Sequence, residues 1–133
     1  LEELLKTSDF ITINSAYNPS LRHMISTPEF DMMKKTAYLI NCARGPIVSE
    51  EALVKALENK KIEGAALDVY EFEPKISDVL KKMENVVLTP HIGNATFETR
   101  EQMALCAVKN IINVFNGVEP YSAINKYKNY KIK

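Results

Sequence analysis

Cysteine is scarce in this chain, which has only two among its 133 residues. Neither Cys42 nor Cys106 has the spacing of a metal-ligand set, and two cysteines are too few for a disulfide-rich scaffold. The sequence therefore argues against a small secreted protein held together by disulfides, and it predicts no metal site. A reducing cytoplasm is the compartment that this cysteine usage favours.

A long hydrophobic run is also missing, and so is an excess of charge of one sign. No stretch approaches the ~18 apolar residues of a transmembrane helix, and we expect neither a membrane span nor a signal peptide. The 17 basic residues balance the 17 acidic ones, so the chain lacks the electrostatic footprint of a protein that binds nucleic acid or an anionic membrane. The tail has a local excess of lysine, which we interpret as a solvated end rather than a binding patch.

Short apolar runs alternate with segments of helical period along the chain. The predicted strands are 9–14, 37–42, 64–69 and 85–89. Their near-continuous apolar character predicts burial on both faces. The predicted helices are 28–35, 50–60 and 95–116, with a weaker helical turn at 76–83. Thr27 and Ser49 are the expected caps of the first two helices, and Asn116-Gly117 is the expected stop of the third. This alternation is typical of βαβ units, so the predicted fold class is α/β with a parallel sheet.

Three polar residues follow three of these strand-like runs, namely Arg44, Glu73 and His91. Side chains beyond the carboxyl ends of parallel strands meet in one crevice, where α/β proteins bind ligands. An arginine can hold a planar carboxylate through two parallel hydrogen bonds, and a histidine can exchange a proton near neutral pH. A carboxylate beside that histidine would fix its tautomer. The trio could therefore bind an anionic substrate and move a proton.

Each of these residues also has an ordinary structural interpretation. Arg44 could pair with a helix acid, His91 could be a plain loop residue, and Glu73 could be a solvated acid beside Glu71. His23 has no polar companions along its loop, and we interpret it as an ordinary surface histidine. Asp68 ends an otherwise apolar strand and needs a partner, which could be a cofactor amide or a helix N-terminus.

Three segments, LINCARGPIV, GAALDVYEFEP and NVVLTPHIGNAT, add a family resemblance. In order and spacing they resemble the C-terminal part of the nicotinamide-binding domain of D-isomer-specific 2-hydroxyacid dehydrogenases. This family includes glyoxylate/hydroxypyruvate reductases and D-lactate dehydrogenases, and the resemblance covers about residues 4–120. It implies a Rossmann-like doubly wound sheet, a dimeric oxidoreductase, NAD or NADP as cofactor, and a small 2-oxo or 2-hydroxy acid as substrate. An NAD(H)-sensing corepressor-like binding module is the alternative.

The resemblance also implies roles for individual residues. Arg44 resembles the arginine that binds the substrate carboxylate, Glu73 the acid that pairs with the catalytic histidine, and His91 the proton donor. Asp68 resembles the acid that orients the nicotinamide carboxamide. The implied cofactor-binding residues are Ser15, Ala16, Cys42, Ala43, Arg44, Asp68, His91, Ile92 and Gly93. Asn14-Ser15-Ala16 stands where many members read H-x-P. We expect Cys42 to be a packed small residue rather than a reactive thiol.

Glycine is the last scarce residue, with four in the chain and none in a G-x-G-x-x-G spacing. By the resemblance, residues 1–133 would be a partial NAD(P)-binding domain without the phosphate-binding half or the substrate domain. Helix 95–116 would run toward the domain junction and 117–133 would form the tail. The residue that selects NAD or NADP would lie upstream, so the choice stays open. We expect residues 1–133 alone to have negligible dehydrogenase activity.

Overall fold

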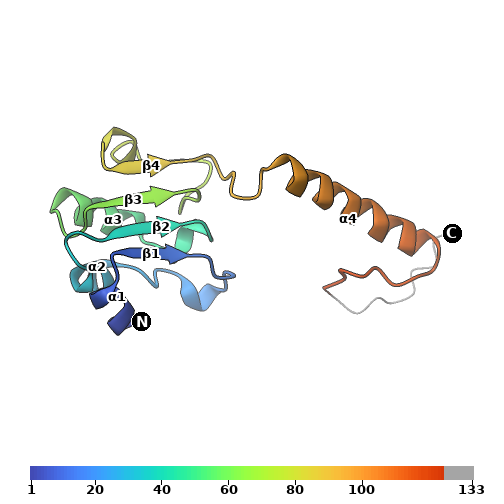
Figure 1. Ribbon diagram of the computed structural model, residues 1–133, viewed down its shortest axis with the longest axis horizontal. Helices are drawn as coiled ribbons and strands as arrows, with labels where there is room; N and C mark the ends of the chain where they lie inside the picture. Colours follow the sequence, from blue (N-terminus) through green and yellow to red (C-terminus); the bar gives the residue numbers. More distant parts are fainter. Residues whose placement is uncertain (125–133) are drawn as a thin grey trace. The chain divides into compact units, whose positions relative to one another are not determined.

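The computed structural model describes residues 1–124 of the chain (Figure 1). It forms two compact units, residues 1–93 and the part from Asn94 onward, which are described separately here. The tail predicted over 117–133 is covered only as far as residue 124, so most of its lysines and tyrosines lie outside the described residues.

The first unit is built on a four-stranded parallel sheet with the strand order β1-β2-β3-β4. The strands are β1 Phe10–Ile13, β2 Tyr38–Asn41, β3 Gly64–Leu67 and β4 Val86–Leu88. The helices of this unit are α1 Glu2–Thr7, α2 Thr27–Met32 and α3 Glu50–Glu58, with short 3-10 turns at Pro19–Leu21, Gly45–Ile47 and Leu80–Lys82. The predicted α/β class and parallel sheet are confirmed, and each predicted strand is present in a slightly shorter form.

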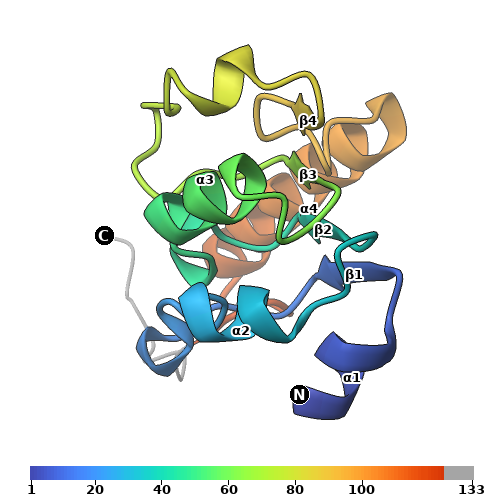
Figure 2. The same ribbon diagram turned by 90° about the vertical axis from the view of Figure 1, so that its left-hand side faces the viewer.

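The core of the first unit lies on one face of the sheet, where α2 and α3 pack (Figure 2). Successive side chains of a strand point to opposite faces, so Ile11, Ile13 and Leu39 share the buried face. The opposite face carries Phe10 and Val87, which are 68% and 63% exposed. The prediction that the strands are buried on both faces is therefore wrong within the described part of the chain, because α2 and α3 cover one face only.

The helix starts follow local hydrogen-bonding rules. Ser49 caps α3 by accepting a hydrogen bond from the Ala52 backbone N–H, as predicted. The cap of α2 is Ser26 rather than the expected Thr27, because Ser26 and Glu29 form a reciprocal capping box. The helical turn predicted over 76–83 is reduced to a single 3-10 turn, in which only Leu80 is buried. One buried side chain does not give a helix an apolar face to pack.

The second unit contains helix α4, Phe97–Phe115. Thr96 caps its start by accepting from the Thr99 N–H, and the helix ends at Asn116, followed by Gly117 at φ 69°. This ending confirms the predicted Asn-Gly stop. None of the residues of α4 is buried. Within residues 1–124, no helix is long and apolar enough to span a membrane.

Candidate active site

The candidate site residues all follow the carboxyl ends of the four parallel strands. Figure 1 shows the four strand arrows pointing the same way, so the segments after β1, β2, β3 and β4 leave the sheet at one edge. Ser15 follows β1, Arg44 follows β2, Asp68 and Glu73 follow β3, and His91 follows β4. This is the edge at which open α/β sheets bind ligands.

Glu73 and His91 come together as an acid–imidazole pair. The Nδ1 atom of His91 lies 3.3 Å from Oε2 of Glu73, and both side chains remain partly exposed. Because a carboxylate oxygen only accepts, Nδ1 carries the hydrogen in this contact and Nε2 is the free ring nitrogen. The second oxygen of Glu73 accepts from the Tyr70 backbone N–H at 3.0 Å, which fixes the carboxylate. The pair predicted from sequence is thus present as a contact.

A cavity of about 440 Å³ adjoins this pair. Its lining includes Tyr70, Ile76 and Pro90, together with Glu73 and His91. Mostly apolar walls with a few convergent polar groups are typical of small-ligand sites, and this volume lies in their usual range of ~300–1,000 Å³.

Asp68 is 6% exposed and is satisfied by the segment that follows β4. Its Oδ1 accepts from the Thr89 hydroxyl at 2.6 Å and from the Ile92 N–H at 2.8 Å, and its Oδ2 accepts from the Gly93 N–H at 2.8 Å. Burial works against ionisation, but these three hydrogen bonds and the nearby His91 together lower the pKa of Asp68. Within the protein, the partners of Asp68 are therefore a hydroxyl and two loop amides rather than a helix N-terminus.

The Asp68 contacts hold an unusual backbone conformation at His91. His91 has φ 54°, in the left-handed region that non-glycine residues rarely adopt. The two amides that follow it are the ones bound to Asp68, so the carboxylate ties down the strained turn from one side. Asp68 therefore supports the placement of the imidazole directly.

Tyr70 is a buried residue that contacts the ends of both β3 and β4. It is 5% exposed, and its hydroxyl lies 2.8 Å from the carbonyl oxygen of Thr89 and 3.2 Å from that of Leu67. Burial, followed by the negative charges of Asp68, Glu50 and Glu73, raises the pKa of Tyr70. The hydroxyl consequently stays protonated near neutral pH and anchors the strand end.

Arg44 lies in a short loop that Asn41 organises. Asn41 is 1% exposed; its Oδ1 accepts from the Ala43 N–H at 3.1 Å and its Nδ2 donates to the Arg44 carbonyl at 3.2 Å. Arg44 is exposed, and its Nη1 donates to the Ala43 carbonyl at 2.6 Å, which leaves other guanidinium donors available. No ion pair with a helix acid forms within the described residues, and none joins Arg44 directly to Glu73 or His91.

The Arg44 loop packs against the loop that carries Glu73. A Cβ atom at Gly45 would overlap the carbonyl carbon and oxygen of Tyr70, so only glycine allows this approach. The backbones of 44–46 and 70–71 are in contact at this point. Two of the predicted catalytic side chains are therefore carried on adjoining loops.

The sequence did not reveal a polar cluster around Glu71, which lies next to these loops. Glu71, passed over as a neighbour of Glu73, has a side chain only 4% exposed, and its Oε1 lies 2.6 Å from His23 Nε2 and 3.0 Å from Arg22 Nη2. The prediction that His23 lacks polar companions is wrong, because its partner lies 48 positions away in the sequence. No local signal could have revealed that pairing, although a buried asparagine such as Asn41 could have been suspected from its place in an apolar strand.

The predicted cofactor-binding residues differ in accessibility. All are exposed except Ala43 and Asp68, which are 5% and 6% exposed. Cys42 is exposed directly after β2, so the expectation that it is a packed residue is wrong. Exposed small residues at Ser15, Ala16 and Cys42 leave this edge of the sheet accessible.

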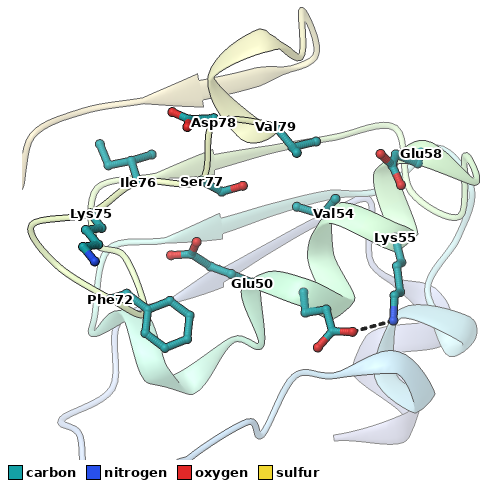
Figure 3. A pocket seen from close by; sticks show the side chains of 11 residues that line it. Glu50, Val54, Lys55, Glu58, Phe72, Lys75, Ile76, Ser77, Asp78 and Val79 are labelled. Carbon is teal, nitrogen blue, oxygen red and sulfur yellow. Dashed lines mark hydrogen bonds and ion pairs between the residues drawn. The ribbon is translucent and has the colours of Figure 1, made fainter.

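Another cavity, of about 570 Å³, lies between α3 and the loop 72–79. Figure 3 shows Val54, Lys55 and Glu58 on the helix side and Phe72 and Lys75 on the loop side. Its lining contains none of Arg44, Glu73 and His91. Its acidic and basic groups include the exposed pair Glu51–Lys55, so it presents a mixed rim rather than a binding constellation.

Comparison with known proteins identifies the family. The model of the "D-isomer specific 2-hydroxyacid dehydrogenase, NAD binding domain" family matches residues 1–93. The chain belongs to this family. The match ends where the first compact unit ends, and it contains every strand of the sheet.

Individual 2-hydroxyacid dehydrogenases agree with this membership. A Staphylococcus epidermidis protein named "Putative 2-hydroxyacid dehydrogenase" is 65% identical over 125 residues, which are 94% of this chain and 39% of that protein. The NAD-complexed D-isomer specific 2-hydroxyacid dehydrogenase of Lactobacillus delbrueckii ssp. bulgaricus is 34% identical with a TM-score of 0.86, over 94% of this chain and 42% of that one. The NADPH-dependent glyoxylate/hydroxypyruvate reductase of Sinorhizobium meliloti, solved with NADP and malonate, is 32% identical with a TM-score of 0.82, over 86% and 36%.

The chain spans about two fifths of the length of the curated relatives that it matches. The structural relatives are Rossmann-type dehydrogenases, so the expected Rossmann-like α/β architecture is confirmed along with the family.

Proposed function

We propose that this chain carries the catalytic residues of an NAD(P)-dependent dehydrogenase that interconverts a small 2-oxo acid and a D-2-hydroxy acid. The observation that supports the proposal most is the Glu73–His91 contact beside a cavity of ligand size at the carboxyl edge of the sheet. Family membership supplies the reaction class, and the substrate is of the glyoxylate, hydroxypyruvate or pyruvate kind. We also propose that the parent enzyme is a cytoplasmic homodimer.

His91 would act as the proton donor. With Nδ1 bound to Glu73, Nε2 is the nitrogen that would give a proton to the carbonyl oxygen of the 2-oxo acid and take it back in the reverse reaction. The Glu73 carboxylate would stabilise the imidazolium before transfer. When bound, the nicotinamide cofactor supplies or accepts the hydride at the carbonyl carbon.

Arg44 would bind the substrate carboxylate. Its guanidinium uses one donor on the Ala43 carbonyl and retains the others for a planar anion. As negative charge develops on the carbonyl oxygen, protonated His91 and Arg44 would stabilise it together. Asp68 would hold the His91 turn through the Ile92 and Gly93 amides, and these residues would help to hold the nicotinamide end of the cofactor.

NAD and NADP both remain candidates for the cofactor. The structural relatives named above include one complex with NAD and one with NADP. The substrate domain and the phosphate-binding half are proposed to come from the remainder of the parent protein, with helix α4 leading toward the junction. Isolated residues 1–133 are then expected to lack measurable dehydrogenase activity.

The test is 2-oxo acid-dependent oxidation of NADH and NADPH by the full-length dehydrogenase that carries this sequence. A panel of glyoxylate, hydroxypyruvate and pyruvate, run with each cofactor, is expected to give turnover with at least one combination. Tight NAD(H) binding without turnover of any 2-oxo acid would instead support the corepressor-like module and overturn the enzyme proposal.

A further inference from the structure

Glu71 is the buried centre of a polar network that the proposed chemistry does not use. Its Oε1 accepts from Arg22 Nη2 at 3.0 Å and lies 2.6 Å from His23 Nε2, and its Oε2 accepts from the Glu50 N–H at 3.1 Å. Glu50 returns the contact, because its Oε1 accepts from the Glu71 N–H at 2.7 Å. We call Arg22, His23, Glu50 and Glu71 the Glu71 network.

Glu71 is unusual among loop residues because its charged side chain is buried. The Glu71 side chain is 4% exposed, whereas the next residue, Phe72, is 60% exposed and lines the cavity of Figure 3. A buried carboxylate is costly unless charged or hydrogen-bonding partners compensate for its lost hydration. Within residues 1–124, no group of three or more His, Cys, Asp or Glu side chains is placed to hold a metal ion. The compensation at Glu71 therefore comes from Arg22, His23 and the Glu50 amide.

The network joins the segments that carry Arg44 and Glu73. On one side, the His23 N–H donates to the Pro46 carbonyl at 2.8 Å, which fastens the 22–23 segment to the Arg44 loop. On the other side, the Tyr70 N–H donates to Glu73 at 3.0 Å, one residue before Glu71. At Gly45 the two backbones touch, where a Cβ atom would overlap Tyr70.

The backbone conformation of His23 depends on contacts with both neighbouring segments. His23 has φ 54°, a left-handed conformation that a residue with a side chain keeps only when its surroundings impose it. Its backbone amide is held by Pro46 and its ring by Glu71. The ring contact requires a hydrogen on Nε2, since the carboxylate can only accept.

We propose that Glu71 is a positioning residue that fixes the Arg44 loop and the Glu73 loop relative to each other. This role rests on the proposed function, because it matters for turnover only if Arg44 and Glu73 act on one substrate. The Glu71 carboxylate touches neither substrate nor cofactor. It acts through the 22–23 segment on one loop and through its own backbone on the other.

The test compares Glu71→Gln and His23→Ala with the matched control Glu51→Gln in the full-length dehydrogenase. Glu51 is 80% exposed, and within residues 1–124 its ion-pair partner is Lys55 of the same helix. In folded protein assayed well below its melting temperature, Glu71→Gln is expected to lower kcat/KM for the 2-oxo acid about ten- to a hundredfold, since small misplacements of reacting groups cost rate on this scale. The control is expected to keep kcat and KM within about twofold of the parent enzyme.

Double variants separate positioning from a general loss of stability. If His23 acts through Glu71, the Glu71→Gln/His23→Ala double variant should lose little more kcat/KM than Glu71→Gln alone. A folded Glu71→Gln enzyme with unchanged kcat and KM overturns the proposal. Should Glu71→Gln fail to fold, His23→Ala, which leaves the Arg22–Glu71 pair intact, decides by the same readout.

A measurement without substrate keeps this proposal distinct from the proposed function. In the 133-residue chain, the amide resonances of Arg44, Gly45 and Glu73 are expected to shift in Glu71→Gln and to stay in place in Glu51→Gln. If the full-length protein reduces no 2-oxo acid, the proposed function fails, while this comparison still tests the loop coupling. Unshifted amides in Glu71→Gln overturn the positioning role whatever the reaction.

Discussion

Replacing Asp68 with asparagine is expected to release the turn that holds His91. The wild-type carboxylate accepts three hydrogen bonds, from the Thr89 hydroxyl and from the Ile92 and Gly93 amides. An asparagine side chain has one acceptor oxygen. In its better orientation this oxygen keeps Thr89 and Ile92, and the new NH₂ group faces the Gly93 N–H, donor against donor.

The size of the effect follows from these three bonds. A hydrogen bond to a charged group contributes about 1.5–3 kcal/mol net and a neutral one about 1 kcal/mol. Losing one charged bond and weakening two others should lower the free energy of unfolding by about 2–4 kcal/mol. The left-handed conformation of His91 itself costs about 1–3 kcal/mol. With fewer bonds to offset that strain, His91 should leave φ 54° and lose its contact with Glu73.

The pH dependence gives the effect a signature. Burial opposes ionisation of Asp68, but the bonds from Thr89, Ile92 and Gly93 outweigh it and lower its pKa in the folded state. A group with a lowered folded pKa stabilises the fold fully above its unfolded pKa of about 3.9, and this contribution is lost as the pH falls through the folded pKa. The difference between the parent chain and Asp68→Asn should therefore be complete at pH 7 and shrink below about pH 4.

Urea unfolding of the 133-residue chain, followed by far-UV circular dichroism, measures this difference at pH 7 and at descending pH. Hydrogen exchange at Ile92 and Gly93 reports the turn itself, and both amides should exchange faster in Asp68→Asn. Asp78→Asn is the matched control, since Asp78 is 85% exposed and its ion-pair partner among the described residues is nearby Lys81. An Asp68→Asn chain within about 0.5 kcal/mol of the parent at pH 7, with protected amides, would refute the reasoning.

Two further substitutions test the packing and the charges near the site. Gly45→Ala would press its methyl group into the Tyr70 carbonyl and should lower the free energy of unfolding in urea by about 3 kcal/mol. Gly117 has φ 69° and open space around it, so Gly117→Ala should lower this free energy by only about 1 kcal/mol. Equal losses would contradict the steric argument. Glu50→Gln should raise the urea midpoint of the chain at pH 7, because burial, and then the charge of Glu71, raise the pKa of Glu50, although the hydrogen bond from the Glu71 N–H lowers it. Because the folded pKa of Glu50 is raised, the parent chain loses stability as the pH rises through that pKa. Below the unfolded pKa of about 4.3, Glu50 is neutral in both states, so the gain from Glu50→Gln should vanish. A gain that persists below this pH would contradict the assignment.

The sheet could be predicted because its information is local. Each strand is a short apolar run with a turn signal behind it, and each run carries its polar residue at the end, as at His91 after Pro90. Ser49 and the Asn116–Gly117 stop are likewise read from a few neighbouring residues. The Glu73–His91 contact followed from the parallel order, which brings strand ends to one edge.

The misses near the candidate site are non-local. Glu71 meets His23 and Arg22 across 48 and 49 positions, so no window of sequence shows that the acid is buried. Asp68 was expected to need a partner, and its donors arrive from the segment after β4, far along the chain. Whether a sheet face is exposed depends on which helices pack against it, and a run of apolar residues in a strand does not show which helices will do so.

The most direct test of the central claim is the turnover number of His91→Ala in the full-length dehydrogenase, measured as 2-oxo acid-dependent NAD(P)H oxidation. If His91, held by Glu73, is the proton donor, kcat should fall about 10²- to 10⁴-fold in an enzyme that remains folded and still binds cofactor. A folded His91→Ala enzyme with the turnover number of the parent would contradict the assignment of this strand edge as the catalytic site.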